Sequence, residues 1–210
     1  MARKIDLKKR EEIAMATFAL LQKNGFQKTS MSEIAKALNM KRPTLYWYFK
    51  DVGAICETLF AKLMFDVAIH IEEHTKDVEH PIDLLYAHMT AVHEYFAGKE
   101  ELLPCMFQLW ATVGARIDPN DAIALSRSYF LPRRQRYIAA LEAGIAHGTV
   151  APCDPTTLVH LVSAVVDGML LQRITHATTE LPPVNLLIWT RLLEPLKAAP
   201  SPTRTPPHDP

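Results

Sequence analysis

Helical spacing of apolar residues runs through almost the whole chain and constrains its fold more than any other feature. Apolar residues recur three or four positions apart, no convincing alternating strand pattern occurs, and glycine or proline interrupts the pattern where helices should begin or end. We therefore predict an all-α fold of nine helices. The predicted helices cover about 7–23, 31–38, 42–49, 52–78, 82–97, 100–113, 118–147 (with a break or kink at Pro132), 155–176 and 183–197.

Positive and negative side chains are equal in number, at 23 each, but unevenly distributed. Residues 1–50 contain eleven Lys or Arg and four Asp or Glu, a net charge of +7. The remaining residues contain twelve and nineteen, a net charge of −7. A basic N-terminal part on an acidic body indicates that the N-terminal part meets a polyanion.

Composition excludes several other classes of protein. Apolar residues make up 49% of the 210 residues, which is too rich for a disordered chain. No run approaches the roughly 18 apolar residues of a membrane span, and the basic N-terminus lacks the apolar core of a secretory signal. Cys56, Cys105 and Cys153 are widely spaced and form no CxxC pair, which favours reduced thiols in the cytoplasm.

These patterns predict two domains and a tail. Residues 1–51 form a basic domain of three helices. Residues 52–197 form a second helical domain, entered by one long helix. Residues 198–210 contain five prolines and no apolar period, so we expect a disordered tail.

The stretch 25–50 has the local signals of two short helices joined by a tight turn. Ser30 and Glu33 have the spacing of a capping box, and Asn39 suits the turn. Pro43 falls in the first turn of the second helix, where its missing amide hydrogen costs nothing. Leu45 and Phe49, four positions apart, should face the core.

The second of these helices has side chains suited to reading DNA. Lys41 and Arg42 at its start can donate hydrogen bonds to guanine, and Pro43 and Thr44 offer apolar surface to a thymine methyl group. An ordinary basic helix pair with its aromatic residues in the core is the alternative. The three aromatic residues at positions 46–48 argue against it, because they span about 200° of a helix and cannot all face one core.

The residues Gly25-Phe26, Thr29-Ser30-Met31, Ile34-Ala35, Leu45-Tyr46 and Tyr48-Phe49 resemble the N-terminal domain of the TetR family of bacterial transcriptional regulators. The segment 43–47 is similar to the recognition helix of the tetracycline repressor, after which the family is named. The match covers about residues 8–60, and only the helical architecture matches beyond them.

This resemblance implies a cytoplasmic homodimer whose recognition helices enter successive major grooves of a palindromic operator in double-stranded DNA. It implies that residues 1–51 are a DNA-binding helix-turn-helix domain and that residues 52–197 are a ligand-sensing and dimerisation domain. It implies that Arg42, Pro43, Thr44 and Trp47 face bases or sugars, with Lys41 at either bases or phosphates. Ser30, Tyr46, Tyr48 and Lys50 would bind phosphates, and Ser32 completes the DNA-binding set. Three positions depart from the family pattern: Lys41 stands at the usual Ser or Thr cap, Pro43 where a small residue is common, and Val52 where a phosphate-binding lysine is common.

The last two predicted helices are more apolar than one-sided surface helices need to be. With the resemblance, this predicts a four-helix dimer interface, with intramolecular core as the alternative. The interface candidates are Leu158, Leu161, Val162, Val165, Met169, Leu186, Trp189 and Leu193.

A sensor pocket should lie among the helices of the second domain, lined by aromatic residues and methionine with few charges. Plain core is the alternative for each member. Such a cavity suits a small lipophilic or aromatic molecule. The candidates are Leu63, Met64, Val67, His70, His74, Met89, His93, Phe96, Met106, Phe107, Trp110, Phe130 and Arg133.

Two further classes of function find less support. An enzyme would need catalytic motifs, and neither a P-loop, a nucleophile elbow nor a dinucleotide glycine pattern occurs. A membrane-surface protein would use the basic part electrostatically. His70 and His74, four positions apart, with His88 and His93 on the next helix, have a spacing that can hold a metal, but we expect no metal and no cofactor. The sequence thus predicts a ligand-responsive DNA-binding regulator, with repression as the expected mode.

Overall fold

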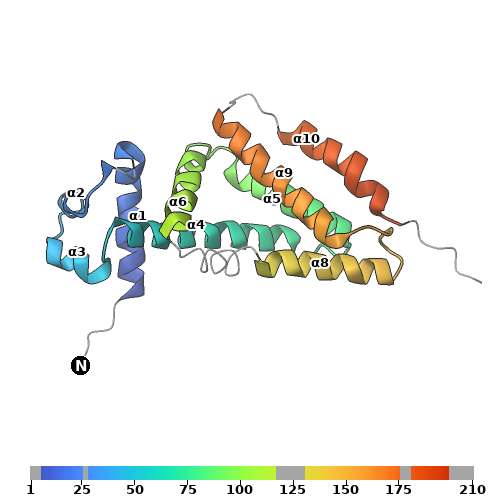
Figure 1. Ribbon diagram of the computed structural model, residues 1–210, viewed down its shortest axis with the longest axis horizontal. Helices are drawn as coiled ribbons and strands as arrows, with labels where there is room; N and C mark the ends of the chain where they lie inside the picture. Colours follow the sequence, from blue (N-terminus) through green and yellow to red (C-terminus); the bar gives the residue numbers. More distant parts are fainter. Residues whose placement is uncertain (1–5, 26–27, 117–130, 176–180, 199–210) are drawn as a thin grey trace, which may run out of the picture. The chain divides into compact units, whose positions relative to one another are not determined.

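The computed structural model describes residues 6–25, 28–116, 131–175 and 181–198. The described residues form nine α-helices and no named strand, which confirms the all-α prediction (Figure 1). The part of the predicted helix 118–147 that precedes Leu131 and most of the predicted tail lie outside these ranges. Pro132, where a break or kink is predicted, is the second residue of the described helix α8 (Leu131–Ala146).

Contacts divide the chain into two compact units, 1–68 with 101–126 and 69–100 with 127–210. The division falls within one helix, which contributes residues to both units. The predicted functional boundary at residue 51 is a different boundary, and it stays a prediction.

The first unit contains α1 (Leu7–Asn24), α2 (Met31–Ala37), α3 (Arg42–Tyr48), the first part of α4 (Val52–Thr75) and α6 (Leu102–Arg116). Asp6 caps α1, because its Oδ1 accepts a hydrogen bond from the amide of Lys9 at 3.1 Å. Gly25 ends the helix with φ 82°, a conformation that favours glycine. The core includes Leu21, Ile34, Leu45, Phe49, Ile55 and Phe60, each at most 1% exposed.

The second unit contains the end of α4, α5 (Pro81–Phe96), α8 (Leu131–Ala146), α9 (Pro155–Thr175) and α10 (Leu181–Ile188). In it α5 packs against α8, α9 and α10. The helical path after α10 continues as the π-helical turn η2 (Trp189–Leu193) and the 3-10 turn η3 (Glu194–Leu196). The last predicted helix is therefore helical as far as Leu196, one residue short of its predicted end, and only its first part is α-helix.

The end of the described chain is fixed by contacts within the second unit. Val150 and Lys197 form an isolated antiparallel bridge, and the amide of Ala151 donates to the carbonyl of Leu196 at 2.8 Å. The Lys197 ammonium group lies 2.9 Å from both carboxylate oxygens of Asp83 at the start of α5. These contacts attach the chain after α10 to α5 and to the loop before α9.

Candidate nucleic-acid interface

The start of α2 is held by the predicted capping box. The Ser30 hydroxyl accepts a hydrogen bond from the Glu33 amide at 3.3 Å, and the Glu33 carboxylate accepts one from the Ser30 amide at 2.7 Å. The Ser30 hydroxyl also donates to Glu33 at 2.7 Å. These hydrogen bonds lower the pKa of the Glu33 carboxyl group. Because the hydroxyl proton of Ser30 points to Glu33, a phosphate contact by Ser30 requires that proton to turn away.

The turn between α2 and α3 depends on Asn39, as predicted. Its φ of 50° lies in the left-handed region, which asparagine tolerates better than most residues. The amide of Met40 then donates to the carbonyl of Ala35 at 2.8 Å, which closes the end of α2. This geometry turns the chain from α2 into α3 within four residues, 38–41.

The helix α3 is anchored on one side only. Leu45 is 0% exposed and Phe49, its C-terminal cap, is 1% exposed, so both face the core as predicted. The guanidinium of Arg10 from α1 lies 4.8 Å from the centre of the Phe49 ring. Pro43 occupies the first turn, and Lys41 takes the cap position without a side-chain capping bond.

The other side of α3 presents large aromatic side chains to solvent. Tyr46 is 46% exposed, Trp47 is 48% exposed, and Tyr48 is half-buried. This agrees with the prediction that the three consecutive aromatics cannot share one buried face. Burial of large aromatic side chains is normally favourable, so a cluster of them left in solvent on so short a helix indicates a surface that binds another molecule.

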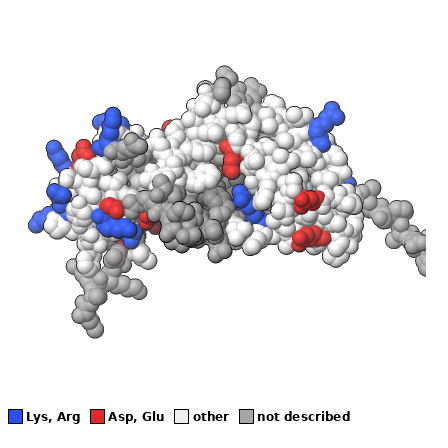
Figure 2. Space-filling model, in the orientation of Figure 1, with Lys and Arg blue, Asp and Glu red and all other residues white. Residues whose placement is uncertain are grey.

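The predicted DNA-binding residues lie on accessible surface. Nine of the ten are exposed and Tyr48 is half-buried. The Arg42 guanidinium lies 5.9 Å from the centre of the Tyr46 ring, one helical turn further along. Lysine and arginine side chains gather on this N-terminal part of the chain in Figure 2. The division of the ten residues between bases and phosphates stays a prediction.

Asp51 caps α4 as predicted, because its Oδ1 accepts a hydrogen bond from the amide of Ala54 at 2.8 Å. Val52, the first residue of α4, is half-buried. The exposed Lys50 precedes it and is the nearest basic residue in sequence.

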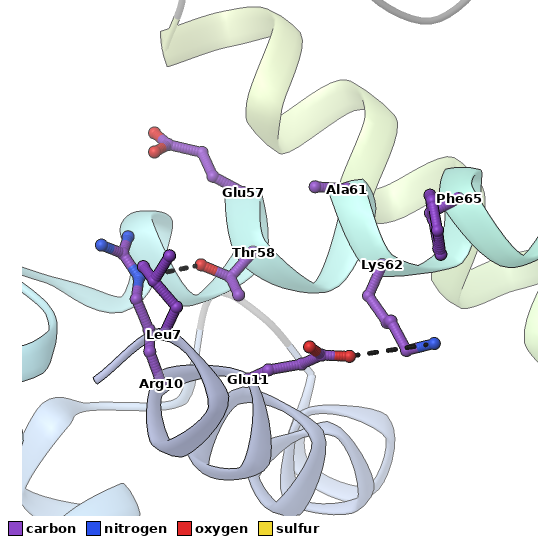
Figure 3. Close-up of a pocket in the computed structure, with 8 residues that line it drawn as sticks. All are labelled: Leu7, Arg10, Glu11, Glu57, Thr58, Ala61, Lys62 and Phe65. Carbon is purple, nitrogen blue, oxygen red and sulfur yellow. Dashed lines mark hydrogen bonds and ion pairs between the residues drawn. The ribbon is translucent and has the colours of Figure 1, made fainter. Parts of the chain in front are cut away.

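A groove of about 430 Å³ lies between α1 and α4 in the first unit (Figure 3). Its lining residues are Leu7, Arg10, Glu11, Glu57, Thr58, Ala61, Lys62 and Phe65. Arg10 Nε donates to Thr58 Oγ1 at 3.4 Å, and Lys62 lies 3.8 Å from the Glu11 carboxylate. None of the predicted sensor residues lines this groove, which is crossed by one hydrogen bond and one ion pair between the two helices.

Comparison with known proteins identifies the family. Residues 13–55 match the family described as "Bacterial regulatory proteins, tetR family". The chain is also 25% identical over 132 residues to the uncharacterized HTH-type transcriptional regulator YhgD of Bacillus subtilis (strain 168). The N-terminal part of the chain therefore carries the DNA-binding domain of the TetR family. The match to YhgD covers 62% of this chain and 66% of that protein. Members of the family are DNA-binding transcriptional regulators.

Solved structures show the same fold. PfmR, a TetR-family regulator from Thermus thermophilus, matches with a TM-score of 0.65 at 18% identity, over 87% of this chain and 97% of PfmR. The fatty acid degradation regulator FadR from Bacillus halodurans matches with a TM-score of 0.64 at 15% identity, over 89% of this chain and 96% of FadR. These likenesses confirm the arrangement of an N-terminal helix-turn-helix and a C-terminal helical region.

The predicted sensor residues are distributed over both units and differ in burial. Phe130 lies outside the described residues. The buried members are Val67, Met89, His93, Phe96 and Met106; the half-buried members are Leu63, Met64, His70, Phe107, Trp110 and Arg133; His74 is exposed. Their assembly into one ligand pocket stays a prediction.

Two polar contacts inside the second unit were not predicted from the sequence. His93 Nδ1 lies 3.0 Å from the amide oxygen of Asn185 on α10, and His88 Nδ1 lies 3.1 Å from the Tyr137 hydroxyl on α8. Burial, with the charges of Arg133 and His93, lowers the pKa of His88 to about 3. Burial raises the pKa of Tyr137 to about 12. Both side chains are therefore neutral near pH 7. Only long-range packing brings these pairs together.

The predicted interface residues divide into two groups. Leu158, Val162, Met169 and Leu193 are buried within the chain's own core. Leu161 and Leu186 are 44% and 58% exposed, and Val165 and Trp189 are half-buried. Two further leucines outside the predicted set are also exposed, Leu171 at 49% and Leu187 at 56%.

Among the described helices, α9 is the one that is long and apolar enough to cross a membrane by length and composition, with 33% of its most apolar window buried. A single such helix is weak evidence, because core helices of soluble proteins meet the same criteria.

Proposed function

We propose that this TetR-family chain is a homodimeric repressor that binds a palindromic operator and is released when a small lipophilic or aromatic molecule binds its C-terminal region. The observation that carries the proposal is the two-sided character of α3. Leu45 and Phe49 anchor the helix in the core, while Arg42 and Trp47 remain on the surface. A helix held in this way presents its N-terminal residues to the major groove in a fixed orientation.

Support for the dimer comes from the exposed leucines on α9 and α10. Four leucine side chains, at positions 161, 171, 186 and 187, are each more than 40% exposed in the single chain. Two such helices from each of two chains suit a four-helix interface. If a second copy covers this surface, Leu186→Asp should give a monomer in light scattering after size-exclusion chromatography. Glu194→Asp, an exposed substitution that keeps its charge, is the control.

The second unit has the character expected of a site for a lipophilic molecule. Met89 and Phe96 on α5 are buried, and the neutral His88 and His93 place a few polar atoms among apolar side chains. An apolar interior with a small number of fixed polar groups is typical of ligand sites. We propose that the effector binds in this unit near α5.

We propose that α4 transmits ligand binding to the DNA-binding helices, because of its position in the chain. This helix begins three residues after Phe49 and continues into the second unit. Two recognition helices must lie about 34–36 Å apart to enter successive major grooves. A ligand that tilts α4 by a few degrees would change this separation and lower operator affinity.

The test is a binding measurement with DNA from the region upstream of the chain's own gene. Fluorescence anisotropy should show a dimer bound to a symmetric site, with an affinity that falls steeply with salt. A thermal-shift screen of lipophilic and aromatic compounds would find the effector, because a ligand of the folded state raises the melting temperature. Equal affinity for upstream and random DNA would contradict the operator, and a stabilising compound that leaves operator affinity unchanged would contradict the sensor role.

A further inference from the structure

Three metal-ligating side chains of the second unit come together at α4 and α5. His70 and His74 lie four positions apart on α4, and Glu94 lies near the end of α5. Each offers one ligand atom, and the three atoms lie within 4.8 Å of one another. The two imidazole ring centres are 4.1 Å apart. Histidines at this spacing share one face of a helix, so both can bind the same ion.

The hydrogen bond of His74 prepares its ring for a metal. Its Nδ1 lies 2.7 Å from the backbone carbonyl oxygen of His70. A carbonyl oxygen only accepts, so Nδ1 carries the hydrogen and the lone pair of the neutral ring is on Nε2. That nitrogen lies 3.6 Å from a carboxylate oxygen of Glu94. A backbone carbonyl that fixes the tautomer in this way is a common outer contact of metal-binding histidines.

His70 adds an observation of its own. Its Nε2 is buried and has no hydrogen-bond partner among the described residues. Buried polar atoms are normally paired, so this nitrogen calls for an explanation. A metal ion held together with His74 and Glu94 would supply the missing partner.

One positive charge near the cluster, the Lys99 ammonium group, disfavours the binding of a cation. The Lys99 ammonium group lies 4.1 Å from the centre of the Tyr95 ring, and that ring lies 5.5 Å from the His70 ring. The ring face of Tyr95 attracts this ammonium group. The Glu94 carboxylate supplies negative charge to the cluster itself, which favours a divalent ion.

We propose that His70, His74 and Glu94 bind one divalent transition-metal ion of the zinc type, with water completing a four-coordinate site. Two imidazole nitrogens and one carboxylate are ligands that suit zinc. Calcium and magnesium prefer oxygen ligands, so they fit this set poorly. The bound ion would join the last turns of α4 to the end of α5. The proposal rests on these three side chains and not on DNA binding.

The experiment uses the full-length chain, freed of any affinity tag and stripped of metal with a chelator. Titration with Co²⁺ should give one equivalent per chain and the intense visible absorption of a tetrahedral site, and Zn²⁺ should displace it. His70→Ala and Glu94→Gln should each lower the affinity at least about tenfold, since even outer-contact changes cost this much. Because the Glu94 side chain is 60% exposed, this second variant tests the site without disturbing the core.

His147→Ala is the matched control. His147 is exposed, and its Nδ1 lies 2.7 Å from the carbonyl of Ala143, as in His74. This variant and Cys153→Ser should bind Co²⁺ like the unaltered chain. Binding of less than one equivalent, a weak octahedral spectrum, or equal affinity in the His70 and Glu94 variants would overturn the proposal.

Discussion

Arg42 provides the sharpest test of how this chain reads DNA. It is the first residue of α3, and its side chain is exposed. We predict that Arg42→Ala weakens binding to the operator but changes binding to random DNA much less. The reason is that a guanidinium can form two hydrogen bonds with guanine in the major groove, whereas phosphate contacts carry no sequence information.

The structure indicates that this change should leave the fold intact. Among the described residues, the guanidinium contacts the Tyr46 ring, whose centre lies 5.9 Å away, near the distance limit of a cation–π interaction. At an exposed site such a contact contributes no more than about 1 kcal/mol. The lost base contact should cost about 1–3 kcal/mol per half-site. A symmetric operator bound by two copies would lose about 2–6 kcal/mol. One half-site alone corresponds to a loss of about 5- to 150-fold in affinity.

The measurement is fluorescence anisotropy with an operator duplex and a shuffled duplex at the same salt concentration. Lys76→Ala, which removes one exposed positive charge from the loop after α4, is the matched control. It should change neither affinity. Thermal melting of both variants checks that the fold is retained. If Arg42→Ala lowers the two affinities by the same factor, Arg42 contacts phosphate and the base-reading role is wrong.

Two further predictions concern stability. Ser30→Ala removes the hydroxyl that accepts from the Glu33 amide, while the backbone amide of residue 30 can still donate to the Glu33 carboxylate. This loss should destabilise the helix-turn-helix by about 0.5–2 kcal/mol, whereas Ser32→Ala, also exposed, should have little effect; urea unfolding followed by circular dichroism measures both. His88 has a folded-state pKa of about 3, below its ordinary value of 6.5, so above pH 6.5 it is neutral in both states. As the pH falls from 6.5 toward 3 the unfolded chain binds a proton that the folded chain does not, and stability should fall by up to about 1.4 kcal/mol per pH unit. His88→Gln should make this decline shallower, and an unchanged slope would show that His88 does not cause it.

The N-terminal helices could be predicted from sequence because their signals are local. A capping box, a turn residue with positive φ and a proline in the first turn each act within four residues, and all three occur where expected. The two faces of α3 follow from helical period alone, since Leu45 and Phe49 are separated by about one turn.

The second unit was harder to predict because its helices are apolar on several sides. In α9 no single polar face marks the direction of the core, so Leu158 and Leu161 looked equivalent although one is buried and the other is 44% exposed. Non-local pairs had no sequence signal at all. The contact between His93 and Asn185 joins residues 92 positions apart, and Glu94 reaches His74 through the packing of two helices.

Val52 allows a final test of where α4 meets DNA. The family resemblance leads one to expect a lysine here, and the first turn of α4 instead begins with a half-buried valine next to the Asp51 cap. Val52→Lys should place an ammonium group on a long, flexible stem at this helix start, within reach of a phosphate. One new phosphate contact per subunit should steepen the dependence of log affinity on log salt by about 1.8 for the dimer. Operator and random DNA should gain affinity by the same factor, because the contact is to the backbone. Val52→Gln, similar in length but uncharged, is the control. An unchanged salt dependence would mean that the start of α4 does not approach DNA, and that Lys50 holds the backbone without help from this helix.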